Sequence, residues 1–148
     1  MTAAHIVVGI AVLALSLAAG AWGAWCWYRF ADPRLFWPLL RAAQAAVVLE
    51  ALIGTVLLIA GRKGYGSLHL LYGILPIAIS LVAEQLRITA AEAVLAARGL
   101  ENAQAVGRLS ASDQRSVVVA IVRREVGVMA VAALVVFALA LRAWTTGT

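Results

Sequence analysis

The sequence is poor in charged residues. Only 13% of its 148 residues are Asp, Glu, Lys or Arg, whereas 64% are hydrophobic and the mean hydropathy is +0.97. A soluble domain has about a quarter charged residues and about half apolar ones. So few polar side chains cannot cover a water-soluble core. The length allows one domain, and the composition predicts that this domain lies in a lipid bilayer.

Cysteine and histidine are nearly absent as well. Cys26 is the single cysteine, which excludes an internal disulfide and a cysteine-based zinc cluster. The two histidines, His5 and His69, are too few for a histidine-rich metal site, so we expect no bound metal ion. The sequence also contains no Ser/His/Asp set, paired-carboxylate site, HExxH motif or glycine-rich phosphate loop. It therefore predicts no catalytic residues and favours a protein that is not an enzyme.

Lysine is also scarce, since Lys63 is the only lysine among the 12 basic residues. Together with the abundance of alanine and valine, this bias indicates a GC-rich bacterial genome. The net charge of +5 would suit a nucleic-acid partner, but the base-contact and stacking features of such binders are absent. In a membrane protein, excess arginine mainly sets the topology. We therefore expect no nucleic-acid partner.

The sequence is rich in long hydrophobic runs. A helix that crosses a bilayer needs about 20 apolar residues, and four segments qualify, at about 5–27, 39–61, 68–87 and 125–143. The first is too long for a signal peptide and lacks its basic start, so we interpret it as a retained helix. Pro33 and Pro38 predict a break before the second span, and the glycines of 61–66 predict a tight turn after it. The predicted fold is an all-α bundle of four transmembrane helices in one domain, residues 1–148.

The basic residues are unevenly distributed among the connections. If both termini lie outside, the outer side holds only Arg62, Lys63 and Arg142, and the cytoplasmic side holds the other nine basic residues, all arginine. The positive-inside rule favours this orientation over its inverse. The sequence therefore predicts a multi-pass protein of the inner (plasma) membrane with both termini outside.

The third connection, residues 88–124, is long but rich in helix formers. Its first part ends at Gly99, a typical helix C-cap residue. Ser110 followed by Asp113 resembles a capping box with Asp in place of Glu or Gln. We therefore expect the third and fourth helices to extend into a cytoplasmic helical hairpin. Its basic residues are interpreted as lipid-facing topology anchors or as contacts to a cytoplasmic partner: Arg98, Arg108, Arg123 and Arg124.

Ionisable residues inside the spans are the strongest functional candidates. Glu50 lies near the middle of the second span, where an unpaired carboxylate is costly. It continues a row of small residues with four-residue spacing, which predicts that Glu50 faces the bundle. It is either a proton or cation site or a protonated group that bridges two helices.

The third span carries a stripe of small and polar residues with three- and four-residue spacing. This spacing places the stripe on one inward-facing side, either as a packing face or as the wall of a cavity. Together with Glu50, its polar members form the predicted intramembrane polar site: Tyr72, Ser80, Glu84 and Arg87.

His5 and His69 begin their spans on the predicted outer side. Two histidines on different helices at matching depth are what a six-coordinate b-type haem requires. Arg62 and Lys63 lie at the same level and are candidate contacts for the haem propionates or another anion. Histidine is also common at membrane boundaries, so chance placement is the alternative.

These residues support three hypotheses about function. The first is a non-catalytic accessory, assembly or scaffold subunit, whose partners are the lipid bilayer and either further copies of the chain or other membrane subunits. The second is a haem b electron-transfer bundle that uses His5 and His69. The third is a small ion- or proton-coupled transporter in which Glu50 titrates.

Overall fold

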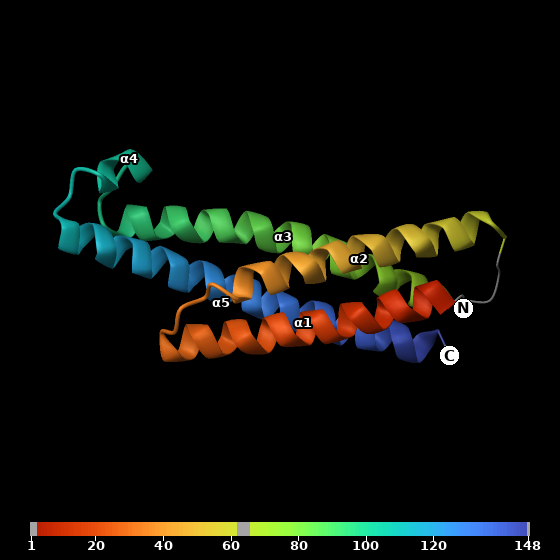
Figure 1. Cartoon of the computed structure of the whole chain (residues 1–148). Coiled ribbons are helices and arrows are strands. Elements are labelled where there is room, and N and C mark those ends of the chain that lie inside the picture. Colours follow the sequence, from red (N-terminus) through yellow and green to blue (C-terminus); the bar gives the residue numbers. More distant parts are fainter. Residues whose placement is uncertain (1–2, 62–65, 148) are drawn as a thin grey trace.

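The computed structural model describes residues 3–61 and 66–147, and every regular element in these residues is a helix. The long helices are α1 (Ala3–Arg29), α2 (Phe36–Ile59), α3 (Ser67–Ala97) and α5 (Ala111–Thr146), and α4 (Ala103–Val106) is a single short turn. Each long helix is long and apolar enough to cross a membrane. The prediction of an all-α protein with four apolar helices is therefore confirmed (Figure 1).

The start of the second helix corrects one expectation. Pro38 was predicted to break the chain, but α2 begins at Phe36 and includes this proline in its first turn. The first backbone N–H groups of a helix have no partner inside it, so a proline there removes no hydrogen bond. The break comes earlier, at 30–35, where Ala31 N donates to Cys26 O at 3.1 Å and closes α1.

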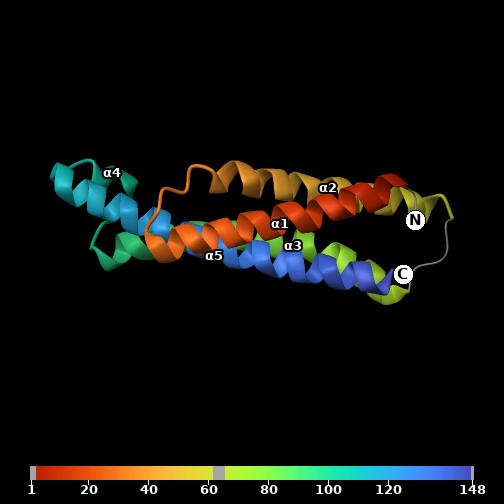
Figure 2. The same ribbon diagram turned by 60° about the horizontal axis from the view of Figure 1, so that its bottom comes forward.

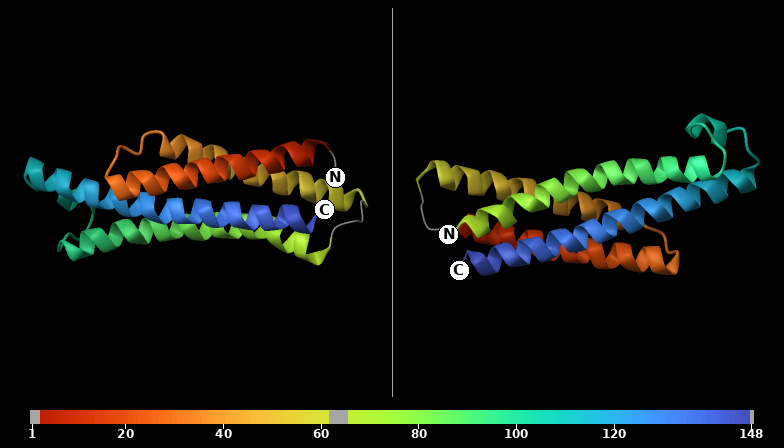
Figure 3. Two further views of the ribbon diagram at one scale, coloured as in Figure 1. Left: turned by 90° about the horizontal axis from the view of Figure 1, so that it is seen from below. Right: turned by 180° about the vertical axis from the view of Figure 1, so that it is seen from behind.

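The four long helices are arranged around a closely packed seam. α5 packs against both α1 and α3, and α2 packs against α1, whereas α2 and α3 barely touch (Figures 1 and 2). α2 and α3 diverge toward the end of the bundle where α1 begins and α5 ends (Figure 3). A cavity lined by all four long helices lies at this end.

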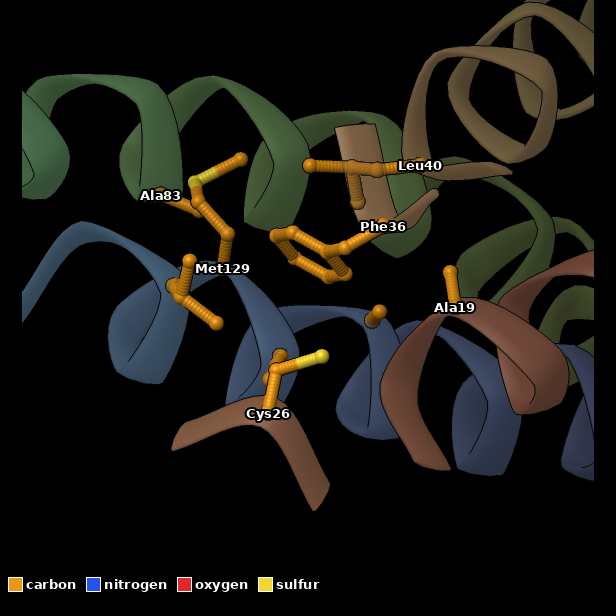
Figure 4. Packing of buried hydrophobic residues seen from close by; sticks show 9 residues of the cluster. Ala19, Cys26, Phe36, Leu40, Ala83 and Met129 are labelled. Atoms are coloured by element: carbon orange, nitrogen blue, oxygen red, sulfur yellow. The ribbon is translucent and has the colours of Figure 1, made fainter. Parts of the chain in front are cut away.

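The core of the seam lies nearer the opposite end. Phe36 is fully buried, and its ring lies among Leu40, Ala83 and Met129, opposite Ala19 and Cys26 of α1 (Figure 4). Glycines on α1 permit this packing.

α3 and α5 continue past the ends of α1 and α2 and are joined through α4 (Figure 1). Gly99 ends α3 with a φ of 66°, a left-handed conformation that glycine adopts readily. Ser110 caps α5, as predicted, because its Oγ accepts a hydrogen bond from Asp113 N at 3.2 Å. Gly99 therefore marks the end of α3, and Ser110 marks the start of α5.

Candidate functional site

A cavity of about 500 Å³ lies at the end of the bundle where α1 begins and α5 ends. All four long helices contribute to its wall, which is largely apolar. Among the polar side chains on the wall are His5, Glu50, His69 and Tyr72. A mostly apolar cavity with a few polar groups is typical of a site for a small molecule or cofactor.

His5 and Glu50 face each other between α1 and α2. Nδ1 of His5 lies 3.0 Å from Oε1 of Glu50, and the His5 side chain is buried. Gly9 makes room for this pair of side chains, since a Cβ there would lie 3.1 Å from Glu50 Oε1. Gly54, from the row of small residues that predicted an inward-facing Glu50, lies beside the imidazole, and a Cβ on it would be in ordinary contact with His5 Cε1 at 3.7 Å.

His69 reaches the same cavity from α3. Its Nδ1 lies 2.9 Å from the carbonyl oxygen of Ala143 on α5, and because a carbonyl only accepts, Nδ1 donates. The His5 and His69 rings have centroids 6.0 Å apart and planes inclined at 71°. A Cβ on Gly147 would come within 2.6 Å of His69 Nδ1, so the end of α5 is shaped around this ring.

The hydrogen bond to Ala143 defines the tautomer of His69. When Nδ1 carries the proton and donates to an oxygen, Nε2 carries the lone pair. Histidines that bind metals are oriented in this way, with the second nitrogen held by a carboxylate or a backbone carbonyl. His69 has such a carbonyl, and Nδ1 of His5 lies 3.0 Å from a carboxylate oxygen of Glu50.

A layer of valines lies at the side of the cavity that faces the middle of the bundle. Val12, Val47 and Val136 are buried together, one from each of α1, α2 and α5. Toward the diverging ends of α2 and α3, the cavity wall includes Leu58 and Leu70, which are 48% and 44% exposed. The valines thus lie between the cavity and the other half of the bundle, and apolar side chains that face outward flank the cavity.

A second group of polar residues lies beyond the valine layer. Glu84 accepts hydrogen bonds from Arg41 and from Gln44, the latter at 3.0 Å, and pairs with Arg87 at 3.2 Å. The guanidinium of Arg87 also lies 5.5 Å from the centroid of the Trp37 ring. This group ties α2 to α3 where they cross.

The structure therefore divides the five residues of the predicted intramembrane polar site. Glu50 and Tyr72 lie at the cavity, and Glu84 and Arg87 lie in the second group. Ser80 belongs to neither, because its Oγ donates to the Pro76 carbonyl of its own helix at 2.8 Å.

The predicted basic residues have different surroundings. Arg98 donates to Ser116 Oγ at 3.1 Å, and Arg123 lies over the Phe30 ring. Arg108 and Arg124 are exposed. The candidate propionate contacts, Arg62 and Lys63, lie outside the described residues.

Sequence reasoning missed several residues of both groups. Arg142 lies with its guanidinium 6.0 Å from the centroid of the Tyr72 ring, at the cavity end. Arg41 and Gln44 were missed although their three-residue spacing places them on one face of α2. Spacing alone could not show that this face meets Glu84.

The cavity offers few side chains that could bind a metal, so it suits a ligand that needs few of them from the protein. Across residues 3–61 and 66–147, no group of three or more His, Cys, Asp or Glu residues could hold a metal ion. A cofactor with its own equatorial ligands requires only two axial histidines. When the chain is compared with protein families, with curated proteins and with solved structures, none of them matches it.

Proposed function

We propose that this membrane protein is a b-type haem-binding bundle for electron transfer, with His5 and His69 as the axial ligands. The observation that carries this proposal is the pair of imidazoles from α1 and α3 at one cavity, with ring centroids 6.0 Å apart. Two histidines on opposite faces of one iron, each with a nitrogen about 2 Å from it, have centroids about 6 Å apart.

The surroundings of both Nδ1 atoms support the same assignment. Nδ1 of His69 donates to the carbonyl oxygen of Ala143 on α5, and Nδ1 of His5 lies 3.0 Å from a carboxylate oxygen of Glu50 on α2. The hydrogen bond of His69 directs its lone pair to Nε2 and fixes the orientation of that ring before a ligand arrives. A histidine that served only as a membrane-boundary residue would need no such support.

The size and lining of the cavity also fit a haem. Cofactor sites usually measure about 300–1,000 Å³ and have mainly apolar walls, and this cavity of about 500 Å³ is of that kind. Haem carries two propionates, which prefer arginine or lysine partners. Arg142 is a described cation at this end, and Arg62 and Lys63 stay predicted contacts.

The absorption spectrum of the purified protein tests this proposal. We expect wild-type protein produced with haem to be red and to show a Soret band of a six-coordinate, low-spin haem. His5→Ala and His69→Ala should each abolish that spectrum, because each removes one of the two ligands. Tyr72→Phe is the matched control, since it changes the same wall of the cavity without removing a ligand.

Helical content measured by circular dichroism shows whether each variant is folded. A colourless wild-type protein after production with haem would refute the proposal. So would a Soret band that stays unchanged in both folded histidine variants.

The other two functions have weaker support. A transporter with Glu50 as its titrating site is consistent with the His5–Glu50 pair, but the layer of Val12, Val47 and Val136 stands between this pair and the other half of the bundle. The accessory, assembly or scaffold role stays a prediction, together with its homo-oligomer or partner subunits. It would be supported by a stable complex in mild detergent.

The proposed topology has both termini outside in the inner (plasma) membrane of a bacterium, and residues 88–124 as the cytoplasmic hairpin. Its support is the excess of arginine on one side and the stacking of Arg29 on Trp25 and of Arg87 on Trp37. Tryptophan and arginine concentrate at membrane boundaries. In this topology the haem lies in the outer half of the membrane.

A further inference from the structure

At the opposite end of the bundle from the cavity, an arginine of α5 is stacked on two aromatic rings from the end of α1. The guanidinium carbon of Arg123 lies 3.8 Å from the centroid of the Phe30 ring and 5.9 Å from that of Trp27. Cations within about 6 Å of a ring centroid are attracted to its face. We call Trp27, Phe30 and Arg123 the Arg123 platform.

Phe30 is held in an unusual backbone conformation. Its φ of 56° is the only positive φ of a non-glycine residue in the described part of the chain. Glycine normally occupies such a position at the end of a helix, and a bulky residue rarely does. This conformation brings the Phe30 ring against Arg123. Phe30 is thus unfavourable as the residue that follows α1, but it positions an arginine.

Trp27 is also accommodated by a specific feature of α5. A Cβ on Gly127 would lie 3.0 Å from Trp27 Nε1, so glycine at this position allows the indole to lie close against the helix. Gly127 is one helical turn from Arg123. The platform is thus preformed by the end of α1 and one face of α5.

The charge of Arg123 is not neutralised within the described residues. Asp32, the nearest acidic residue along the chain to Phe30, is paired with Arg34, whose Nε lies 3.0 Å from its Oδ2. Glu125 interacts with Arg87 and Glu84 instead. The N–H groups of a guanidinium match the oxygens of a phosphate.

We propose that the Arg123 platform binds the headgroup phosphate of an anionic phospholipid such as phosphatidylglycerol. The platform lies where the apolar part of α1 ends, and its rings are well exposed, at 47% for Trp27 and 66% for Phe30. An acyl chain can therefore lie along the bundle below a phosphate that Arg123 holds. A soluble phosphate ligand would gain nothing from these exposed rings. Basic sites at helix ends on the cytoplasmic side bind such lipids in this way.

The test is lipid retention by the full-length protein in mild detergent, measured by native mass spectrometry after addition of phosphatidylglycerol or phosphatidylcholine. We expect the wild type to retain phosphatidylglycerol and to prefer it to phosphatidylcholine. Arg123→Gln should reduce that retention about tenfold, because it removes a charge-assisted contact. Arg123→Lys should reduce it as well, since lysine keeps the charge but lacks the planar edge.

Two variants separate lipid binding from a structural role. Phe30→Gly relieves the positive φ and leaves α1 able to close, so it should keep the fold but weaken retention. Arg115→Gln removes the same charge from an exposed arginine of α5 that has no described aromatic contact, and it should leave retention unchanged.

Three results would overturn the proposal. The first is equal loss of phosphatidylglycerol in Arg123→Gln and Arg115→Gln. The second is full retention in a folded Phe30→Gly protein. The third is an increase in thermal stability with millimolar inorganic phosphate as large as that with the lipid, which would indicate a soluble anion instead.

Discussion

At the scale of single residues, the cavity is asymmetric. Nδ1 of His5 lies 3.0 Å from a carboxylate oxygen of Glu50, whereas Nδ1 of His69 donates to the neutral carbonyl of Ala143. A charged acceptor polarises an imidazole more strongly than a neutral one does, and it raises the basicity of the ring as a ligand. Glu50 would therefore act on an iron held by His5 through that imidazole, as a positioning residue.

We predict that Glu50→Gln raises the midpoint potential of the bound haem at constant pH by about 60 mV, which is a tenfold change in the relative affinity for the two oxidation states. The amide keeps the size of the side chain and its acceptor oxygen, so the haem should stay bound. Redox titration with optical detection measures this shift. Glu84→Gln is the matched control, because Glu84 lies beyond the valine layer. Equal potentials for wild type and Glu50→Gln would contradict the role of Glu50.

The sequence allowed the separate importance of His5, Glu50 and His69 to be predicted, because each is polar in an apolar span. Their pairing could not be predicted. His5 and Glu50 are far apart along the chain, and the rotation of each helix about its axis decides whether their side chains meet. The small residues beside Glu50 indicated that Glu50 faces the bundle, whereas the buried residues of α2 are Phe36, Leu40, Ala43 and Val47. No spacing within one helix identifies the partner on another.

At the scale of helices, glycines decide how closely α1 approaches its neighbours. A Cβ on Gly20 would lie 2.6 Å from Leu134 Cδ2, and one on Gly23 would lie 2.5 Å from the ring of Phe36. Small residues allow such close approach in membranes, where helices associate through packing more than through exclusion of water. Phe36 is fully buried and has no space into which to move.

We predict that Gly23→Ala lowers the free energy of unfolding by about 1–3 kcal/mol, because the added methyl overpacks a filled seam. Gly73→Ala is the matched control, since nothing lies within 4 Å of a Cβ there. It should be neutral or stabilising, because alanine favours a helix more than glycine does. Helicity followed during denaturation in detergent measures both effects. Equal destabilisation by the two substitutions would show that glycine at position 23 is not required for packing.

The helices themselves were largely predictable, whereas their ends were less so. Apolar runs of sufficient length identified all four, and Ser110 and Gly99 marked two ends through capping. The break predicted at Pro38 was wrong because proline disrupts the interior of a helix but not its first turn. α1 ends at Arg29, close to the predicted end of the first span at about 27, but the left-handed conformation of Phe30 could not be predicted, since its contact with Arg123 comes from a distant part of the chain.

At the scale of the whole molecule, the bundle has two different ends. One holds the cavity and the two histidines, and the other holds the charged group around Glu84 and the Arg123 platform. The extension of α3 and α5 lies at this second end (Figure 1). Because positive charge is retained on the cytoplasmic side during insertion, the second end should face the cytoplasm. A haem at the first end would then exchange electrons with partners at the outer face or within the outer leaflet.

Reporter fusions test this orientation. We predict that alkaline phosphatase is active when fused at Thr148 and inactive when inserted at Gly107, between α4 and α5, and that a fluorescent protein shows the opposite pattern. The prediction follows from nine arginines on one side against three basic residues on the other. Replacing Arg123 and Arg124 with glutamine should leave the orientation intact, because seven arginines remain on the cytoplasmic side. Phosphatase activity at Gly107 alone would indicate the inverse orientation, with the cavity on the cytoplasmic side. Activity at both positions would show that α5 does not cross the membrane.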